Sequence, residues 1–145
     1  MNKKFFAVMV LFITLAICYN AAMAAGANTP QQVHKKYISA VRTRQFDEVK
    51  KYIDSKRVKE WEQRSFELRK EEVEKLNRDI YDNYKVVKTN LKKTTCTLFL
   101  TAQEKDPISG KTKKVNGQVN MVNEIVDEKD PKKTEWKVKS VSWER

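Results

Sequence analysis

Four stretches typical of β-strands follow one another in the second half of this sequence, and they constrain the fold more than any other feature. Short segments with turn-forming residues or many charges separate them, including a turn with Pro and Gly at 106–110. Successive strands with short connections pair antiparallel. The sequence therefore predicts an antiparallel meander with the helices on one side, an α+β fold. The stretches cover about 84–91, 94–103, 113–127 and 134–143.

The last stretch indicates which side of the sheet faces the core. Trp136 and Val138 share one side of a period-2 strand, whereas Val141 and Trp143 have the opposite parity. One extra residue near Ser140, a β-bulge, would return all four side chains to the same face. Without a bulge, Val141 and Trp143 would cover the other face. We expect the bulge, with both tryptophans packed in the core or at its rim.

The two middle stretches repeat this alternation. Leu98 and Leu100 share parity with Cys96, so we expect these three side chains on one face. Val119 and Met121 share parity in the next stretch. Cys96 is the one cysteine after residue 24, and it lies among apolar residues, so we expect a packing role rather than a catalytic thiol.

The region before residue 84 has helical periodicity. A helix start signal at Thr29–Gln32 combines a capping threonine, a proline at the first position and a glutamine that completes a capping box. We expect a helix to about residue 42 and a shorter one over 46–53. The stretch 56–79 contains no Gly or Pro and is predicted to form either one long helix or two pieces that break near 64–66.

The first 24 residues have the pattern of a secretory signal peptide. Lys3 and Lys4 precede an uncharged apolar run over 5–18, and Ala22–Ala24 forms an A-x-A cleavage site. We therefore expect residues 1–24 to be removed and 25–145 to form a single domain that is periplasmic or secreted.

The alternative for this segment is a lipoprotein signal, with Cys18 as the lipidated residue and the protein anchored to a membrane. Ile17 stands where such signals require a small residue. The soluble exported form is therefore favoured.

The chain is basic, with 30 Lys and Arg against 19 Asp and Glu and a net charge of +11, or +9 without Lys3 and Lys4 (11 − 2). A basic sheet suggests an anionic partner such as an envelope lipid or a wall polymer. The simpler interpretation is that these lysines solvate exposed strand positions. Nucleic acid is not expected, because aromatic residues do not interleave with the lysines. The lysines are Lys85, Lys88, Lys92, Lys111, Lys113, Lys114, Lys137 and Lys139.

Three short motifs carry a resemblance to a known family. Thr29–Val33 with Tyr37, Phe46–Val49 with Tyr52, and Trp136–Val138 resemble the nuclear-transport-factor-2-like superfamily, and more closely its small exported bacterial proteins of uncharacterised function. The resemblance implies a cone-shaped domain whose curved sheet of four or more strands wraps around the helices and can leave a pocket. Members act as enzymes, ligand binders or dimerisation modules, so a homodimer is possible and the fold alone does not define the function.

Few residues point to catalysis. The one histidine, His34, lies at the margin of the apolar face of the first helix beside two lysines, and we expect it on the surface. Glu124 is the acid nearest an apolar strand face and is a weak candidate for acid–base chemistry. The sequence contains no clustered glycines, metal-ligand motif or hydrolase motif, so neither a metal nor another cofactor is expected.

We therefore predict an exported, non-enzymatic binding or protein-interaction domain, whose partner is a small apolar ligand or a protein. The alternative is a basic-surface binder of anionic envelope lipid or wall polymer. An isomerase- or dehydratase-like pocket enzyme is less favoured. The side chains expected to line a pocket, or in the simpler interpretation to pack in the core, are Tyr37, Trp61, Phe99, Met121 and Trp136.

Overall fold

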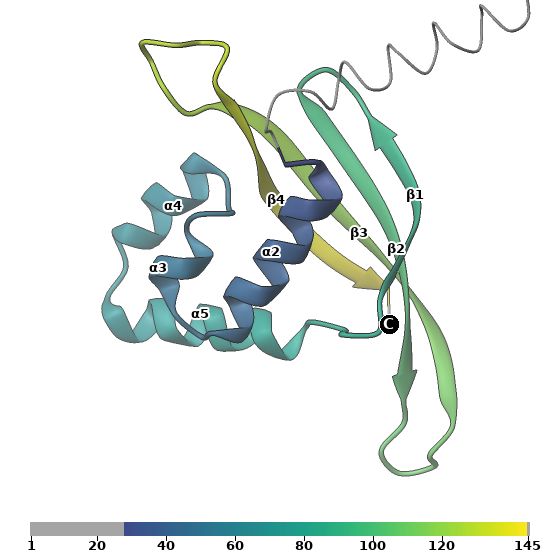
Figure 1. Ribbon diagram of the computed structural model, residues 1–145. Coiled ribbons are helices and arrows are strands. Elements are labelled where there is room, and N and C mark those ends of the chain that lie inside the picture. The colour runs from purple at the N-terminus through teal and green to yellow at the C-terminus, as the bar shows by residue number, and fades with distance from the viewer. Residues whose placement is uncertain (1–27, 145) are drawn as a thin grey trace, which may run out of the picture.

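The computed structural model describes residues 28–144, in which four helices precede a four-stranded antiparallel sheet (Figure 1). Neighbouring strands pair in chain order, β1-β2-β3-β4, which confirms the predicted meander and the α+β class. The elements are α2 (Pro30–Arg42), α3 (Phe46–Val49), α4 (Ser55–Glu62), α5 (Phe66–Arg78), β1 (Lys85–Leu91), β2 (Thr95–Lys105), β3 (Thr112–Ile125) and β4 (Thr134–Glu144).

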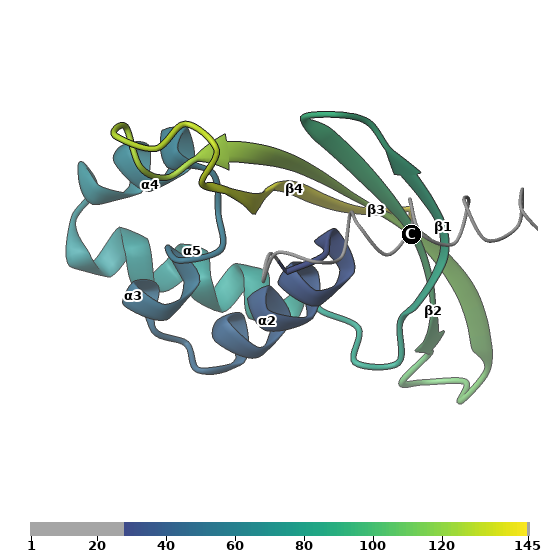
Figure 2. The ribbon, with the colours of Figure 1, turned by 45° about the horizontal axis from the view of Figure 1, so that its top comes forward.

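All of these helices lie on one side of the curved sheet, and the hairpin of β2 and β3 extends beyond them (Figures 1 and 2). The predicted signal peptide and Cys18 fall outside the described residues. None of the helices within 28–144 combines the length and the apolar character needed to cross a membrane.

The core lies between the helices and the inner face of the sheet. Alternate residues of β2 are buried, with Leu98 and Leu100 almost inaccessible, and the buried residues of β3 face the same way. Tyr37 and Val41 cover them from α2. Each large apolar side chain buried in this way contributes about 1.5–3 kcal/mol. The alternation predicted for both strands is confirmed.

The bulge predicted in β4 is present. Asn120 pairs with Ser140 and Met121 with Val138, so Lys139 is an extra residue in β4. Val138 is fully buried, and Trp136, Val141 and Trp143 all pack against the same core. One inserted residue thus places both apolar pairs on the inner face.

Local signals place the start of α2 as expected, whereas the second helix, expected over 46–53, ends at Val49 because residues 52–54 bond to β4 instead. The Thr29 side chain accepts a hydrogen bond from the Gln32 amide, and the Gln32 side chain accepts one from the Thr29 amide at 2.8 Å, completing the capping box. The stretch 56–79 breaks at 63–65, where the Ser65 side chain caps α5. The apolar stripe does not continue across this break, because Phe66 is 68% exposed.

The two outer edges of the sheet differ. Beside β4 runs the segment 52–54: the Val138 amide donates to the Tyr52 carbonyl at 2.7 Å, and the Asp54 amide donates to the Val138 carbonyl at 3.2 Å. Beside β1, no other strand pairs within the described part of the chain. Its edge is interrupted by an irregularity at Val87, which is exposed.

Candidate functional site

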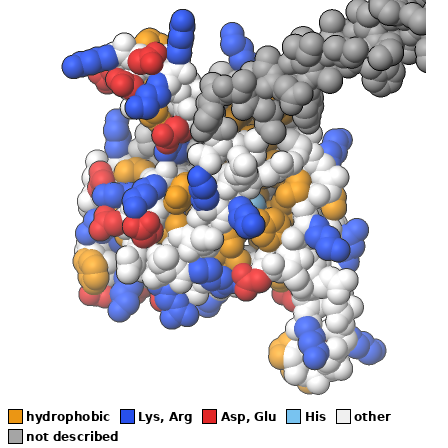
Figure 3. Space-filling view, viewed as in Figure 1, with side chains coloured by type: hydrophobic (Ala, Val, Ile, Leu, Met, Phe, Trp, Pro, Cys, Tyr) orange, Lys and Arg blue, Asp and Glu red, His pale blue; other side chains and the backbone are white. Residues whose placement is uncertain are grey.

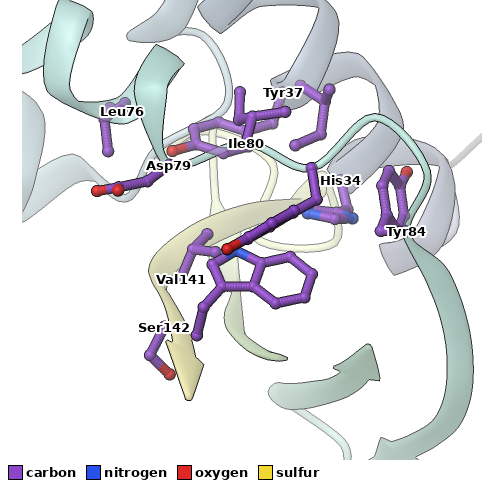
Figure 4. Close-up of a pocket in the computed structure, with 11 residues that line it drawn as sticks. His34, Tyr37, Leu76, Asp79, Ile80, Tyr84, Val141 and Ser142 are labelled. Atoms are coloured by element: carbon purple, nitrogen blue, oxygen red, sulfur yellow. The ribbon is translucent and has the colours of Figure 1, made fainter. Parts of the chain in front are cut away.

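A pocket of about 390 Å³ lies between α2, the end of α5, the segment 79–84 and the end of β4 (Figure 4). Aromatic and aliphatic side chains form most of its wall, together with one imidazole, one carboxylate and the hydroxyl groups of one serine and three tyrosines. The lining residues are His34, Tyr37, Ile38, Leu76, Asp79, Ile80, Tyr81, Tyr84, Val141, Ser142 and Trp143.

His34 is the most unusual member of this wall. It is only 1% exposed, and no group within residues 28–144 hydrogen-bonds to Nδ1 or Nε2 of its ring. The prediction that His34 lies on the surface is therefore wrong. The segment 79–84 folds back along α2, and the Tyr84 ring packs edge-on against the imidazole with 5.0 Å between ring centroids.

Burial also sets the protonation of this side chain. Removal from water disfavours the charged imidazolium and lowers the pKa of His34 from 6.5 to about 4. At neutral pH the ring is uncharged, with one nitrogen that donates and one that accepts. Each buried polar group left without a partner costs about 1–3 kcal/mol, and buried polar groups in folded proteins are usually satisfied.

Trp143 forms part of the opposite wall, and Gly117 makes room for it. The two residues are paired across β3 and β4. A Cβ atom at position 117 would lie 2.5 Å from the Trp143 ring, which is far inside van der Waals contact. On its other side the indole meets the Tyr81 ring edge-on at 4.6 Å, and the Tyr81 hydroxyl donates to Glu104 at 2.8 Å. The wall is therefore fixed before any ligand binds.

The pocket differs in charge from the rest of the protein. The chain has 30 Lys and Arg residues, yet none of those that the structure describes lines this pocket, and Asp79 is the one carboxylate of its described lining. In Figure 4 the Asp79 side chain points away from the His34 ring. The Tyr37 hydroxyl is engaged by Arg57, although burial remains the larger influence and raises the pKa of Tyr37, so the phenol is neutral.

The predicted pocket residues do not come together. Of the five, only Tyr37 lines this pocket. Trp61 and Met121 are buried in the core. Phe99 lies on the opposite face of the sheet, under the Lys88 ammonium at 5.7 Å. Trp136 borders a separate hollow of about 560 Å³.

The predicted basic residues are spread over the sheet and its turns. Lys111, Lys113 and Lys114 lie at the β2–β3 hairpin, whereas Lys92 lies at the opposite end of β2. Lys137 is 14% exposed and bonds to Glu135 at 2.8 Å. Figure 3 shows basic side chains spread over the whole visible face, with acidic ones among them. The remaining residues of the set lie along β1 and β4: Lys85, Lys88 and Lys139.

Lysines do gather around the Trp136 hollow. It lies between the start of α2, the segment after α3 and the loop before β4, where a single carboxylate accompanies the ammonium groups. Sequence analysis named only one of these lysines. The five are Lys36, Lys51, Lys132, Lys133 and Lys137.

Two other candidates have structural roles. The Glu124 carboxylate accepts hydrogen bonds from the Ser55 amide at 3.1 Å and from its hydroxyl at 3.1 Å, and so holds the start of α4 against β3. Cys96 is buried in the core, where desolvation raises the pKa of its thiol. Residues 28–144 contain no group of three or more His, Cys, Asp or Glu side chains that could hold a metal ion.

Comparison with protein-family models, with curated proteins and with solved structures found no match to this chain.

Proposed function

We propose that this protein is an exported, non-enzymatic domain that binds a small molecule in the pocket at His34. One observation carries the proposal: a buried imidazole, with no partner for either ring nitrogen among the described residues, borders an aromatic pocket. Small-molecule sites combine an apolar wall with a few placed polar groups in volumes of about 300–1,000 Å³, and this pocket matches that description.

The pocket is better suited to binding than to proton transfer. A general base works best when its pKa lies near the operating pH, and a pKa of about 4 makes the neutral His34 a weak base. Catalytic imidazoles are also usually oriented by a hydrogen-bonded carboxylate, and no protein group bonds to His34. Ligand-binding members of the nuclear-transport-factor-2-like superfamily offer the parallel that the sequence motifs suggest.

The single histidine of the chain provides a specific test. In tag-free, ¹⁵N-labelled protein, the imidazole resonances report on His34 alone. Three probes with the same ring and different charge are suitable: benzyl alcohol, benzylamine and benzoate. Saturable shifts of the His34 resonances with at least one probe are expected. If none of the three moves them, the proposal is wrong.

Matched variants locate the binding. Trp143→Leu removes an aromatic side chain from the pocket, and Phe99→Leu removes one from the opposite face of the same sheet. We expect about a tenfold or greater loss of affinity in the first variant and an unchanged affinity in the second. Equal losses in both variants would place the binding elsewhere.

The lysine-lined hollow favours a second candidate function, binding of an anionic polymer. Lys132 and Lys133 border this hollow beside Trp136. Lys132→Gln/Lys133→Gln is expected to weaken retention on a heparin column more than Lys113→Gln/Lys114→Gln, which removes the same charge from the hairpin. If both double variants lost retention equally, binding to heparin would depend on the net charge of the protein and not on this hollow.

A further inference from the structure

We infer that the ligand of the His34 pocket is an uncharged ring compound that carries a hydroxyl group, and not an anion. This inference rests on the proposed function and narrows it to one chemical class. It also means that the pocket and the surface of this basic protein bind different kinds of ligand, because the surface would attract anions.

The charges around the pocket argue against an anionic ligand. The lining contains no Lys or Arg, and its one ionisable carboxyl group is Asp79. An anion that left water here would meet no cation, and an uncompensated buried charge costs several kcal/mol. His34 cannot supply the missing charge, because burial keeps its ring neutral.

The unpartnered nitrogens of His34 indicate the polar group of the ligand. A neutral imidazole offers one donor and one acceptor, and neither has a protein partner. A hydroxyl group both donates and accepts, so it can pair with either ring nitrogen, whichever of the two carries the proton. A carboxylate only accepts, so it could pair with one of the two nitrogens and would leave its own charge buried.

The walls indicate the ring. Trp143 and Tyr81 form a fixed edge-to-face pair at 4.6 Å on one side, and Tyr84 stands edge-on to His34 on the other. Flat aromatic walls favour a flat or ring-shaped apolar body. The volume of about 390 Å³ is near the lower end for small-molecule sites and suits one or two rings.

Benzyl alcohol and benzoate test the charge preference, because they share the ring and differ in the polar group. Dissociation constants are measured at neutral pH from the His34 ¹⁵N shifts. We expect benzoate to bind at least about tenfold more weakly than benzyl alcohol. Equal or tighter binding of benzoate, detected at His34, would overturn this inference and leave the proposed function intact. Absence of binding by every probe would overturn both.

Substitutions at position 34 test the role of the ring nitrogens. His34→Gln keeps a donor and an acceptor, whereas His34→Leu removes both and leaves an apolar side chain. With benzyl alcohol observed by saturation transfer, His34→Gln is expected to retain the affinity within about threefold and His34→Leu to lose about tenfold or more. Identical affinities in the two variants would mean that the nitrogens do not bind the ligand. Proton–nitrogen correlation spectra check that both variants are folded.

Discussion

At the residue scale, His34 couples the stability of the fold to pH. Its pKa is about 4 in the folded protein and 6.5 in the unfolded chain, so the unfolded state binds more protons between these values. Stability is therefore expected to fall as the pH drops from about 6.5 to about 4. The difference of 2.5 (6.5 − 4) corresponds to a loss of about 3 kcal/mol. Urea unfolding at several pH values between about 6.5 and about 4 measures this loss of stability.

His34→Gln is the control, because it removes the titrating group and leaves every carboxylate in place. The contribution of the carboxylates is common to both proteins, so the difference between the two pH profiles isolates the histidine. Parallel profiles would contradict the lowered pKa.

Gly117 supports a second prediction at this scale. In Gly117→Ala, the new Cβ must displace the Trp143 ring, which is fixed on its other face by Tyr81. We expect a loss of about 1–3 kcal/mol and weaker binding of benzyl alcohol. In a Trp143→Leu background the same substitution should cost much less. A double-mutant cycle of Gly117→Ala and Trp143→Leu, measured by thermal unfolding, gives the coupling free energy between the two residues. Additive losses of stability would contradict this prediction.

Single residues are also where sequence analysis failed. Helical periodicity indicates that α2 has an apolar face, and Val33, Tyr37 and Val41 are indeed buried, but it cannot reveal the width of the buried face. His34 is covered by Tyr84, which lies fifty positions later and approaches only through the path of the segment 79–84. The neighbouring lysines suggested exposure, yet on a helix they point in other directions from His34.

At the scale of elements, the bulge in β4 determines which residues reach the core. Deleting Lys139 removes the extra residue and forces Trp136 and Val138 onto one face and Val141 and Trp143 onto the other. We expect the variant to lose at least about 3 kcal/mol, the cost of removing a large side chain from a core. Deleting Glu128 in the preceding loop, the matched control, should cost far less. Equal urea midpoints for both deletions would contradict this role.

Elements were the most predictable level of the structure. The capping box at Thr29 and the parity of β4 are encoded within a few residues, so sequence alone indicates them. The break before α5 was one of two alternatives, and the structure decides for it. The candidate site was less predictable. Tyr37 was identified, but Tyr81 and Trp143 meet only after α5 and β4 have packed together.

At the scale of the whole molecule, the His34 pocket, whose described lining has no Lys or Arg, and the basic surface should respond differently to salt. Screening weakens interactions between charges and leaves a neutral ligand almost unaffected. Between about 50 and about 500 mM NaCl, the affinity for benzyl alcohol is expected to change by less than about twofold. The His34 shift titration, repeated at each salt concentration, measures this change. A steep fall in affinity would show that the ligand binds through charged groups.

The two borders of the sheet limit how copies of this protein can join edge to edge. An additional strand meets no paired segment along β1, whereas at β4 the segment 52–54 already bonds to both backbone groups of Val138. Two molecules that met through β1 would each present the β4 border, obstructed at Val138, on the outer side. Further strand addition would then meet an obstructed border at both ends, which hinders the growth of a β-rich chain into fibrils.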